Sequence, residues 1–264
     1  MKLFKNTIFI ALLCAVLTSC GNQSTRVGIM NDSNIVAVDQ KADDVPVLKS
    51  NFNDRFELKK KVVIDVPYYS QVDYPTGCEL ISTQMLLEFY GYEVGADLMV
   101  KSGMIKTCEF EEKDGKIYGG DPNQVFIGNP DKEDGLGCYS GAIAKALTDF
   151  LPSEKYEVEN LEKVSLEDIC RRYIYDEIPV LIWASQGMQS TYKGENNSWI
   201  IKGTDEKFTW QSNEHCLVLV GYDEKYYYFN DPLTEKAVKY EKSVTEKRYK
   251  EMGMQAVAVT RRNS

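Results

Sequence analysis

The feature that most constrains this chain is a long apolar run, residues 80–90, that follows the sequence Tyr-Pro-Thr-Gly-Cys-Glu of residues 74–79. Apolar side chains occupy most of the circumference of the helix that this run predicts, so the helix is expected to be enclosed by protein. Gly91 supplies its C-terminal stop. Thr76 and Glu79 have the spacing of a capping box, which predicts that the helix begins here.

Cys78 is the second feature, because this helix start places its thiol in the first turn. Unpaired backbone N–H groups and the helix macrodipole favour negative charge there, so the thiol is expected to ionise more readily than a free cysteine. The neighbouring Glu79 opposes that effect. The alternative interpretation is a small buried apolar side chain without chemistry. A nearby base would decide between the two.

The only histidine of the sequence, His215, supplies a candidate base. Residues 215–222 and 226–229 predict two strands of a β-hairpin with a turn at residues 223–225. Partners across a hairpin have a nearly constant sum of residue numbers, which places His215 opposite residues 231–233. Opposed residues share a face about 5 Å apart, so Asp231 is expected to accept the imidazole N–H and fix the tautomer. A lone histidine is more often structural, but this arrangement fits the base and orienter of an activated nucleophile.

Further short motifs accompany the segments around Cys78 and His215. These motifs are VPYYSQ at residues 66–71, GGDP at 119–122, GCY at 137–139, PVLIW at 179–183 and NDP at 230–232. With these motifs the chain resembles the peptidase C-39-like cysteine peptidases, which are relatives of the bacteriocin-leader peptidases within the papain-like fold. The resemblance extends over roughly residues 62–260. Its length and order make it far more specific than a single motif.

The resemblance implies a role for each of four residues. Cys78 is the nucleophile, His215 the general base and Asp231 its orienter. Gln71 is the side-chain donor of an oxyanion hole beside the Cys78 backbone N–H, and the loss of such a donor typically costs about 100-fold in rate. The alternative for Gln71 is an ordinary polar residue at a strand end. Bacteriocin-leader peptidases are fused to transporters and cut after Gly-Gly, and neither property is expected here.

The order of the predicted elements gives an α+β fold, in which the N-terminal helix carrying Cys78 packs on a C-terminal antiparallel sheet. Further helices are expected at residues 92–104, 139–151 and 165–176, the last capped by Ser165 and Asp168. Strands are expected at residues 180–183, 199–201, 207–210 and 256–259. Residues 109–137 predict a long surface loop, which is either a wall of the substrate groove or a solvated insertion.

The N-terminal residues predict export and a lipid anchor. Residues 1–19 have two lysines and then an apolar stretch too short to span a bilayer, as in a signal peptide. The following Cys20 resembles the lipid-modified cysteine of a bacterial lipobox, and an ordinary secretory signal is the alternative. Residues 20–61 are polar and predict a flexible tether, with a short strand possible near residues 35–38. Residues 62–264 form the catalytic domain, which is expected outside the cytoplasm on a bacterial membrane.

Charge and cysteine content restrict the partners. The formal net charge of −9 becomes −11 without Lys2 and Lys5, since residues 1–19 contain no acid. Nucleic acid is therefore not expected as a partner, whereas a cationic substrate or simple solubility fits. Core cysteines are expected to be unpaired, and Cys108 with Cys138 is the disulfide to test first. The absence of a C-x-x-C pair and the single histidine predict no zinc site, and no cofactor is expected.

Two classes of function remain open at this point. The first is a membrane-anchored thiol peptidase that hydrolyses peptide or related amide bonds through the Cys78, His215 and Asp231 triad and an acyl-enzyme. Its substrate would be a peptide or a peptidoglycan-derived fragment. The same fold could also serve as a papain-like amidase or acyltransferase acting on peptidoglycan. The second class is a lipid-anchored module that binds peptide or cell wall without turnover.

Overall fold

The computed structural model describes residues 29–31, 34–36, 46 and 59–262. The predicted signal segment, Cys20 and most of the predicted tether lie outside the described residues. Strands β1 (Ile29–Asn31) and β2 (Asn34–Val36) pair antiparallel within the tether region, and β2 overlaps the possible short strand near residues 35–38. Among the described residues, no helix is both long and apolar enough to cross a membrane.

The centre of the fold is a seven-stranded sheet in which every pair of neighbours is antiparallel. Its order is β14-β13-β12-β9-β15-β8, and β3 also pairs with β12. The strands are β3 (Val62–Val63), β8 (Tyr156–Glu162), β9 (Val180–Ser185), β12 (Glu214–Tyr222), β13 (Tyr226–Asn230), β14 (Val238–Glu241) and β15 (Gln255–Arg261). Both faces of β9 and β12 are buried, so these central strands lie under helices on each side.

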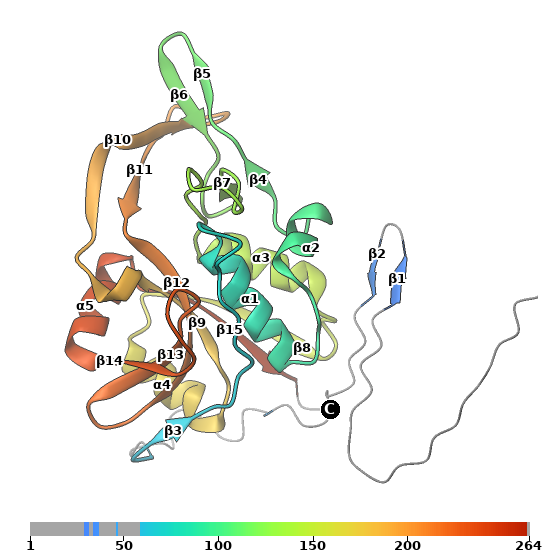
Figure 1. Cartoon of the computed structure of the whole chain (residues 1–264), viewed down its shortest axis with the longest axis vertical. Coiled ribbons are helices and arrows are strands. Elements are labelled where there is room, and N and C mark those ends of the chain that lie inside the picture. Colours follow the sequence, from blue (N-terminus) through green and yellow to red (C-terminus); the bar gives the residue numbers. More distant parts are fainter. Residues whose placement is uncertain (1–28, 32–33, 37–45, 47–58, 263–264) are drawn as a thin grey trace, which may run out of the picture.

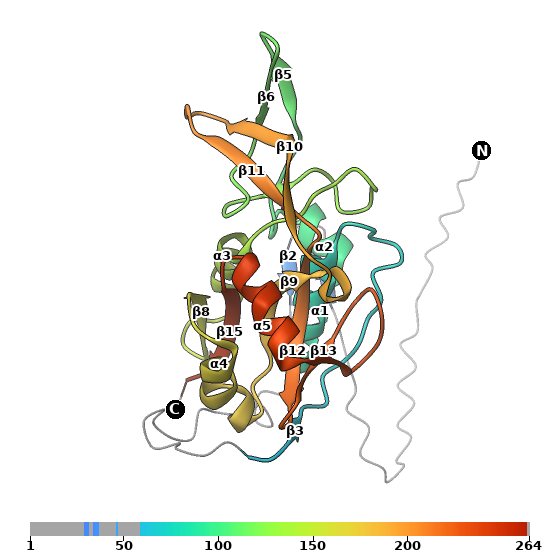
Figure 2. The same ribbon diagram turned by 90° about the vertical axis from the view of Figure 1, so that its left-hand side faces the viewer.

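Helices cover the sheet on both faces. Helices α1 (Cys78–Phe89) and α3 (Ser140–Phe150) lie on one face and α5 (Lys242–Glu251) on the other (Figures 1 and 2). Helix α1 packs against β12 and β9, and its side chains Leu80, Met85, Leu86 and Leu87 have no exposed surface. The predicted α+β fold, with an enclosed N-terminal helix on an antiparallel sheet, is therefore confirmed.

Shorter helices connect these layers. Helix α2 (Ala96–Lys101) follows α1, and α4 (Leu166–Arg172) is followed by a 3-10 turn at Ile174–Asp176. The Ser165 side chain accepts a hydrogen bond from the Asp168 N–H at 3.1 Å, as the predicted cap requires. A second 3-10 turn, Gln186–Met188, follows β9.

A smaller sheet extends away from the main one at the top of Figure 1. It has the order β11-β10-β6-β5 and consists of β5 (Glu111–Lys113), β6 (Lys116–Gly119), β10 (Tyr192–Ile201) and β11 (Lys207–Ser212). A short parallel pair, β4 (Thr107–Cys108) and β7 (Phe126–Ile127), lies beneath it. Residues 109–137 are therefore not a structureless loop. Asp114 and Gly115 both have positive φ, so this Asp-Gly pair forms the tight turn between β5 and β6.

Candidate active site

Cys78 is the first residue of α1, as expected, but the helix start differs from the predicted capping box. Gly77 is the N-cap residue and no side chain caps the helix. The Thr76 hydroxyl donates instead to the carbonyl of Lys132 at 3.0 Å. Glu79 accepts the backbone N–H of Cys138 at 2.5 Å. Both side chains thus have distant partners, which is why the local capping prediction is wrong.

The Cys78 thiol lies inside the molecule, with 5% of the residue exposed. Its Sγ donates to Oε2 of Glu79 at 3.3 Å and accepts the backbone N–H of Cys216 at 3.4 Å. Burial raises the pKa of this thiol well above its ordinary value, and the nearby carboxylates of Glu79 and Glu214 raise it further. The expectation of an easily ionised thiol is therefore wrong for this side-chain position, because desolvation and negative charge outweigh the helix terminus.

His215 and Asp231 form a buried pair. Strands β12 and β13 pair in the predicted hairpin, with Val218 opposite Asn230. The His215 Nε2 lies 2.7 Å from Asp231 Oδ1, and neither side chain has exposed surface. The predicted contact between imidazole and carboxylate is present, although Asp231 follows the last residue of β13 and is not directly opposite His215 in the strand register.

Asp231 is held as a carboxylate by several donors. Burial raises its pKa, but hydrogen bonds from His215, from the Leu233 N–H at 2.9 Å and from the Tyr240 hydroxyl at 2.8 Å outweigh burial, so the pKa lies below its usual value. A carboxylate can only accept, so Nε2 of His215 carries the proton. The other ring nitrogen, Nδ1, is then an acceptor, and it is buried without a hydrogen-bond partner.

One pocket joins these groups. It has a volume of about 260 Å³ and is lined by Cys78, His215 and Gln71, together with Glu214 and Trp210. Residues 133, 135 and 136 also line it. The C-terminal part of residues 109–137, for which a groove wall is one of two expectations, therefore lines this pocket. The structure thus gathers the three predicted residues that would face a substrate, from the loop before α1, from α1 and from β12.

Gln71 is near the thiol, but its amide is engaged elsewhere. Its Nε2 donates to the carbonyl oxygens of Tyr74 at 3.3 Å and Pro75 at 3.1 Å. The amide oxygen is buried and has no partner. The reverse orientation would place that oxygen against two carbonyl oxygens, so the observed one is favoured. In this conformation both N–H groups of the amide are occupied, and an oxyanion would need the amide to turn.

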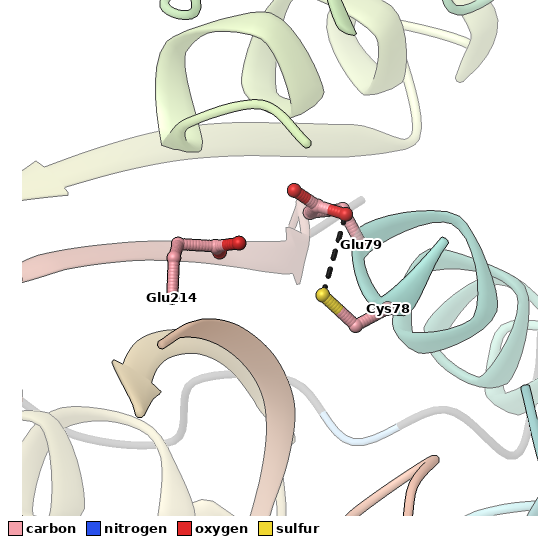
Figure 3. A group of neighbouring side chains, drawn as sticks. All are labelled: Cys78, Glu79 and Glu214. Atoms are coloured by element: carbon pink, nitrogen blue, oxygen red, sulfur yellow. Dashed lines mark hydrogen bonds between the residues drawn. The ribbon is translucent and has the colours of Figure 1, made fainter. Parts of the chain in front are cut away.

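Two buried glutamates beside Cys78 were missed as site residues. Glu79 and Glu214 have 0% and 5% exposure, and Figure 3 shows the Glu214 carboxylate directed toward Glu79 and the thiol. Burial raises the pKa of both carboxyl groups, and the negative charge of Glu79 raises the pKa of Glu214 further. The available signals were a glutamate directly after the cysteine and another within the apolar strand directly before the histidine. Neither indicates that the two side chains meet.

The cysteines are unpaired among the described residues, and Cys108 and Cys138 are both free thiols. A disulfide between them, the pairing to test first, is therefore not formed. Cys108 pairs with Ile127 across β4 and β7, and Ile127 in turn bridges to Gly137 on its other side. Two strand spacings of about 4.8 Å thus separate the segments. Cα atoms more than about 7 Å apart cannot form a disulfide without backbone movement.

Most of this chain is similar to a known protein family. The profile of the Peptidase_C39 like family matches residues 63–257. The chain belongs to this family. The uncharacterized protein YvpB of Bacillus subtilis (strain 168) is 28% identical over 238 residues, which cover 84% of this chain and 90% of YvpB.

One solved structure supports the same assignment to the Peptidase_C39 like family. The crystal structure of a candidate C39-like peptidase from Bacillus anthracis superposes with a TM-score of 0.65 at 28% identity, covering 78% of this chain and 100% of that one. Xylellain, a cysteine protease from Xylella fastidiosa, gives a TM-score of only 0.34 at 11% identity over 78% of this chain and 88% of its own. The first similarity confirms the α+β fold of the family, and the second is too low to support an inference.

Proposed function

We propose that this chain is a cysteine peptidase that cleaves peptide or related amide bonds through an acyl-enzyme, with Cys78 as nucleophile. The observation that carries the proposal is the buried contact of 2.7 Å between His215 and Asp231. Nδ1 of His215 has no hydrogen-bond partner, and His215 and Cys78 line the same pocket. This is the arrangement of a base and its orienter next to a thiol at a helix start.

The chemistry requires the thiol to move from its position beside Glu79. Rotation about the Cα–Cβ bond of Cys78 takes Sγ away from Glu79, and His215 Nδ1 then accepts the thiol proton as sulfur attacks the amide carbon. The imidazolium returns that proton to the leaving amine. Asp231 stabilises the imidazolium and holds its orientation. Water, activated by the same nitrogen, then releases the acyl group.

The oxyanion requires donors at the same place. The backbone N–H of Cys78 has no intrahelical acceptor, since it belongs to the first residue of α1. Gln71 supplies a second N–H once substrate turns its amide away from the carbonyls of Tyr74 and Pro75. Substrate binding would therefore complete the site.

The reactivity of Cys78 toward iodoacetamide tests the triad, with mass spectrometry reporting each cysteine separately. Cys108, which is partly exposed, serves as the ordinary thiol within the same chain. We expect Cys78 to react faster than Cys108 at neutral pH, and His215→Ala to remove that advantage. A Cys78 that is slower than Cys108 in both proteins would instead favour a module that binds peptide or cell wall without turnover.

Peptide and muropeptide libraries, compared between the natural chain and Cys78→Ala, identify the substrate. Cleaved peptides indicate a peptidase, and changes confined to muropeptides indicate the amidase or acyltransferase alternative. The proposed location, outside the cytoplasm on a bacterial membrane, has its own test. We expect the protein to sediment with membranes through a lipid on Cys20, and Cys20→Ala to release it.

A further inference from the structure

A second cluster of reactive groups shares Cys78 with the candidate active site. It consists of the Cys78 thiol and the carboxylates of Glu79 and Glu214, whose nearest ligand atoms all lie within 4.8 Å of one another. All three residues are buried. Within the part of the chain that the structure describes, neither glutamate forms an ion pair with lysine, arginine or histidine. We propose that this cluster binds a divalent transition-metal ion, with Zn²⁺ the best match, and that the bound ion blocks the thiol.

The spacing of the first two ligand atoms fits such an ion. Sγ of Cys78 and Oε2 of Glu79 are 3.3 Å apart. Zinc bound to sulfur at about 2.3 Å and to oxygen at about 2.0 Å, with a tetrahedral angle, sets its ligands about 3.5 Å apart. The thiol and the carboxylate therefore already have nearly the separation of two ligands on one zinc ion, and the Glu214 carboxylate needs only a small shift to join them.

Glu214 supplies an independent sign that a partner belongs here. Its Oε1 is buried and accepts no hydrogen bond. Figure 3 shows this carboxylate pointing toward Glu79 and the Cys78 thiol. A buried carboxylate oxygen without a donor is costly, and a cation removes that cost.

Gly137 keeps the space at the two carboxylates clear. A Cβ at this position would lie 2.3 Å from Oε1 of Glu79 and 3.1 Å from Oε2 of Glu214. Any larger residue would therefore displace the Glu79 carboxylate and crowd that of Glu214. The positive φ of 138° at Gly137 also favours glycine. The Gly137 backbone thus lies close to both acidic groups.

The donor set selects the kind of ion. One sulfur and two carboxylate oxygens suit Zn²⁺, whereas Mg²⁺ and Ca²⁺ require oxygen ligands only and more of them. Three protein ligands would leave a fourth position for water. Cys78 and Glu214 both line the pocket, which gives an ion a path from solvent.

Binding would have a direct chemical consequence for the thiol. A Zn–S bond forms as the S–H bond of Cys78 breaks, and the proton passes to solvent or buffer. The sulfur lone pair that would attack a carbonyl or an alkylating reagent is then held by the metal. This inference goes beyond the proposed peptidase activity, since metal binding needs no turnover.

Titration of the full chain with Co²⁺ tests the site, because cobalt bound to a thiolate gives a near-ultraviolet charge-transfer band. We expect one equivalent to bind with this band and Zn²⁺ to displace it. Glu214→Gln should weaken binding at least roughly 10- to 100-fold, the range seen even for residues behind a ligand. Glu133→Gln is the matched control, because Glu133 lines the same pocket outside the cluster, and its affinity should equal that of the natural chain.

Two further arms cover the case in which Glu214→Gln does not fold. Cys78→Ser removes only the sulfur, and we expect it to lose the charge-transfer band while its circular dichroism is unchanged. Zn²⁺ should also protect Cys78, but not Cys108, from iodoacetamide. The proposal is overturned by a natural chain without the band, by a band that persists in Cys78→Ser, or by Glu214→Gln binding as tightly as Glu133→Gln. These readouts remain valid whether or not the protein is a peptidase.

Discussion

Two buried carboxylates flank the candidate base, and they differ in almost everything except burial. Asp231 and Glu214 are 0% and 5% exposed. Asp231 receives hydrogen bonds from His215, Leu233 and Tyr240, and its pKa is lowered. Glu214 has an oxygen without any donor and faces a second acid, Glu79, and its pKa is raised. Burial raises the pKa of both groups, so the hydrogen bonds that Asp231 accepts account for its lowered pKa.

The comparison also separates two kinds of role. A carboxylate with three donors is fixed in place and suits the task of orienting an imidazole. A carboxylate lacking donors is ready to take up a proton or a cation. The site therefore has a stable side, where Asp231 contacts His215, and a responsive side, where Glu214 lies near Glu79 and Cys78.

Asp231→Asn should give the largest effect, because it removes the charge on the stable side. The amide could offer an N–H to the imidazole and favour the wrong tautomer, which leaves Nδ1 protonated and unable to act as a base. We expect kcat on the substrate found by library screening to fall on the order of 1,000- to 10,000-fold. Asp223→Asn is the control, because Asp223 lies in the turn of the same hairpin and accepts backbone N–H groups there. Equal losses in both variants would contradict a special role for Asp231.

Gly137→Ala should disturb the responsive side through crowding. The new methyl group would meet the Glu79 carboxylate, and the positive φ would be strained. We expect a loss of about 2–4 kcal/mol in the free energy of unfolding, measured with urea. Gly103→Ala is the control for backbone strain, since Gly103 also has positive φ but nothing within 4 Å of the added Cβ. Similar losses at both positions would mean that the carboxylates are not crowded.

The contrast between the two sides also shows what the sequence could predict. Helix α1, the β12–β13 hairpin and the Ser165 cap all follow from patterns within a few residues, and the structure contains them. Asp231 could be placed beside His215 because hairpin register links neighbouring segments. The stable side of the site was therefore predictable from local geometry and the family resemblance.

The responsive side was not predictable, because it depends on contacts between distant segments. Glu79 fits a local capping box, yet its carboxylate is taken by the Cys138 N–H, 59 residues away. Glu214 lies on another element, and no periodicity relates it to Glu79. Helix α5 was missed for a similar reason, since its sequence KSVTEKRYKE is mostly polar and only Thr245, Arg248 and Tyr249 are buried.

Tyr240→Phe would weaken the stable side by one donor. Its hydroxyl donates to Asp231 Oδ2 at 2.8 Å, and a hydrogen bond to a charged group contributes about 1.5–3 kcal/mol. We expect a loss of that size in the free energy of unfolding at neutral pH. Tyr249→Phe is the matched control, because the Tyr249 hydroxyl is buried without a partner, so its removal should be neutral or stabilising. A larger loss of stability in Tyr249→Phe than in Tyr240→Phe would show that the hydrogen bond to Asp231 does not stabilise the fold.

The pH dependence of stability should show the two sides with opposite signs. The pKa of Glu79, which burial raises, is about 7 in the folded chain and about 4.3 when unfolded. Between these values the folded state holds more protons, so stability falls as pH rises, by up to about 1.4 kcal/mol per pH unit for one whole proton. The pKa of Asp231 is lowered by its hydrogen bonds despite burial, so its contribution is present above about pH 3.9 and is lost as pH falls through the folded value.

Urea unfolding across this range, with a chelator present to exclude metal ions, separates the two contributions. Glu79→Gln cannot ionise, so the free energy of unfolding should fall less steeply between about pH 4.3 and 7 than it does in the natural chain. Asp231→Asn should leave that decline in place and reduce the loss of stability below about pH 4. Equal slopes for the natural chain and Glu79→Gln would mean that Glu79 ionises normally. In that case the difference between the two sides would lie in hydrogen bonding alone and not in charge.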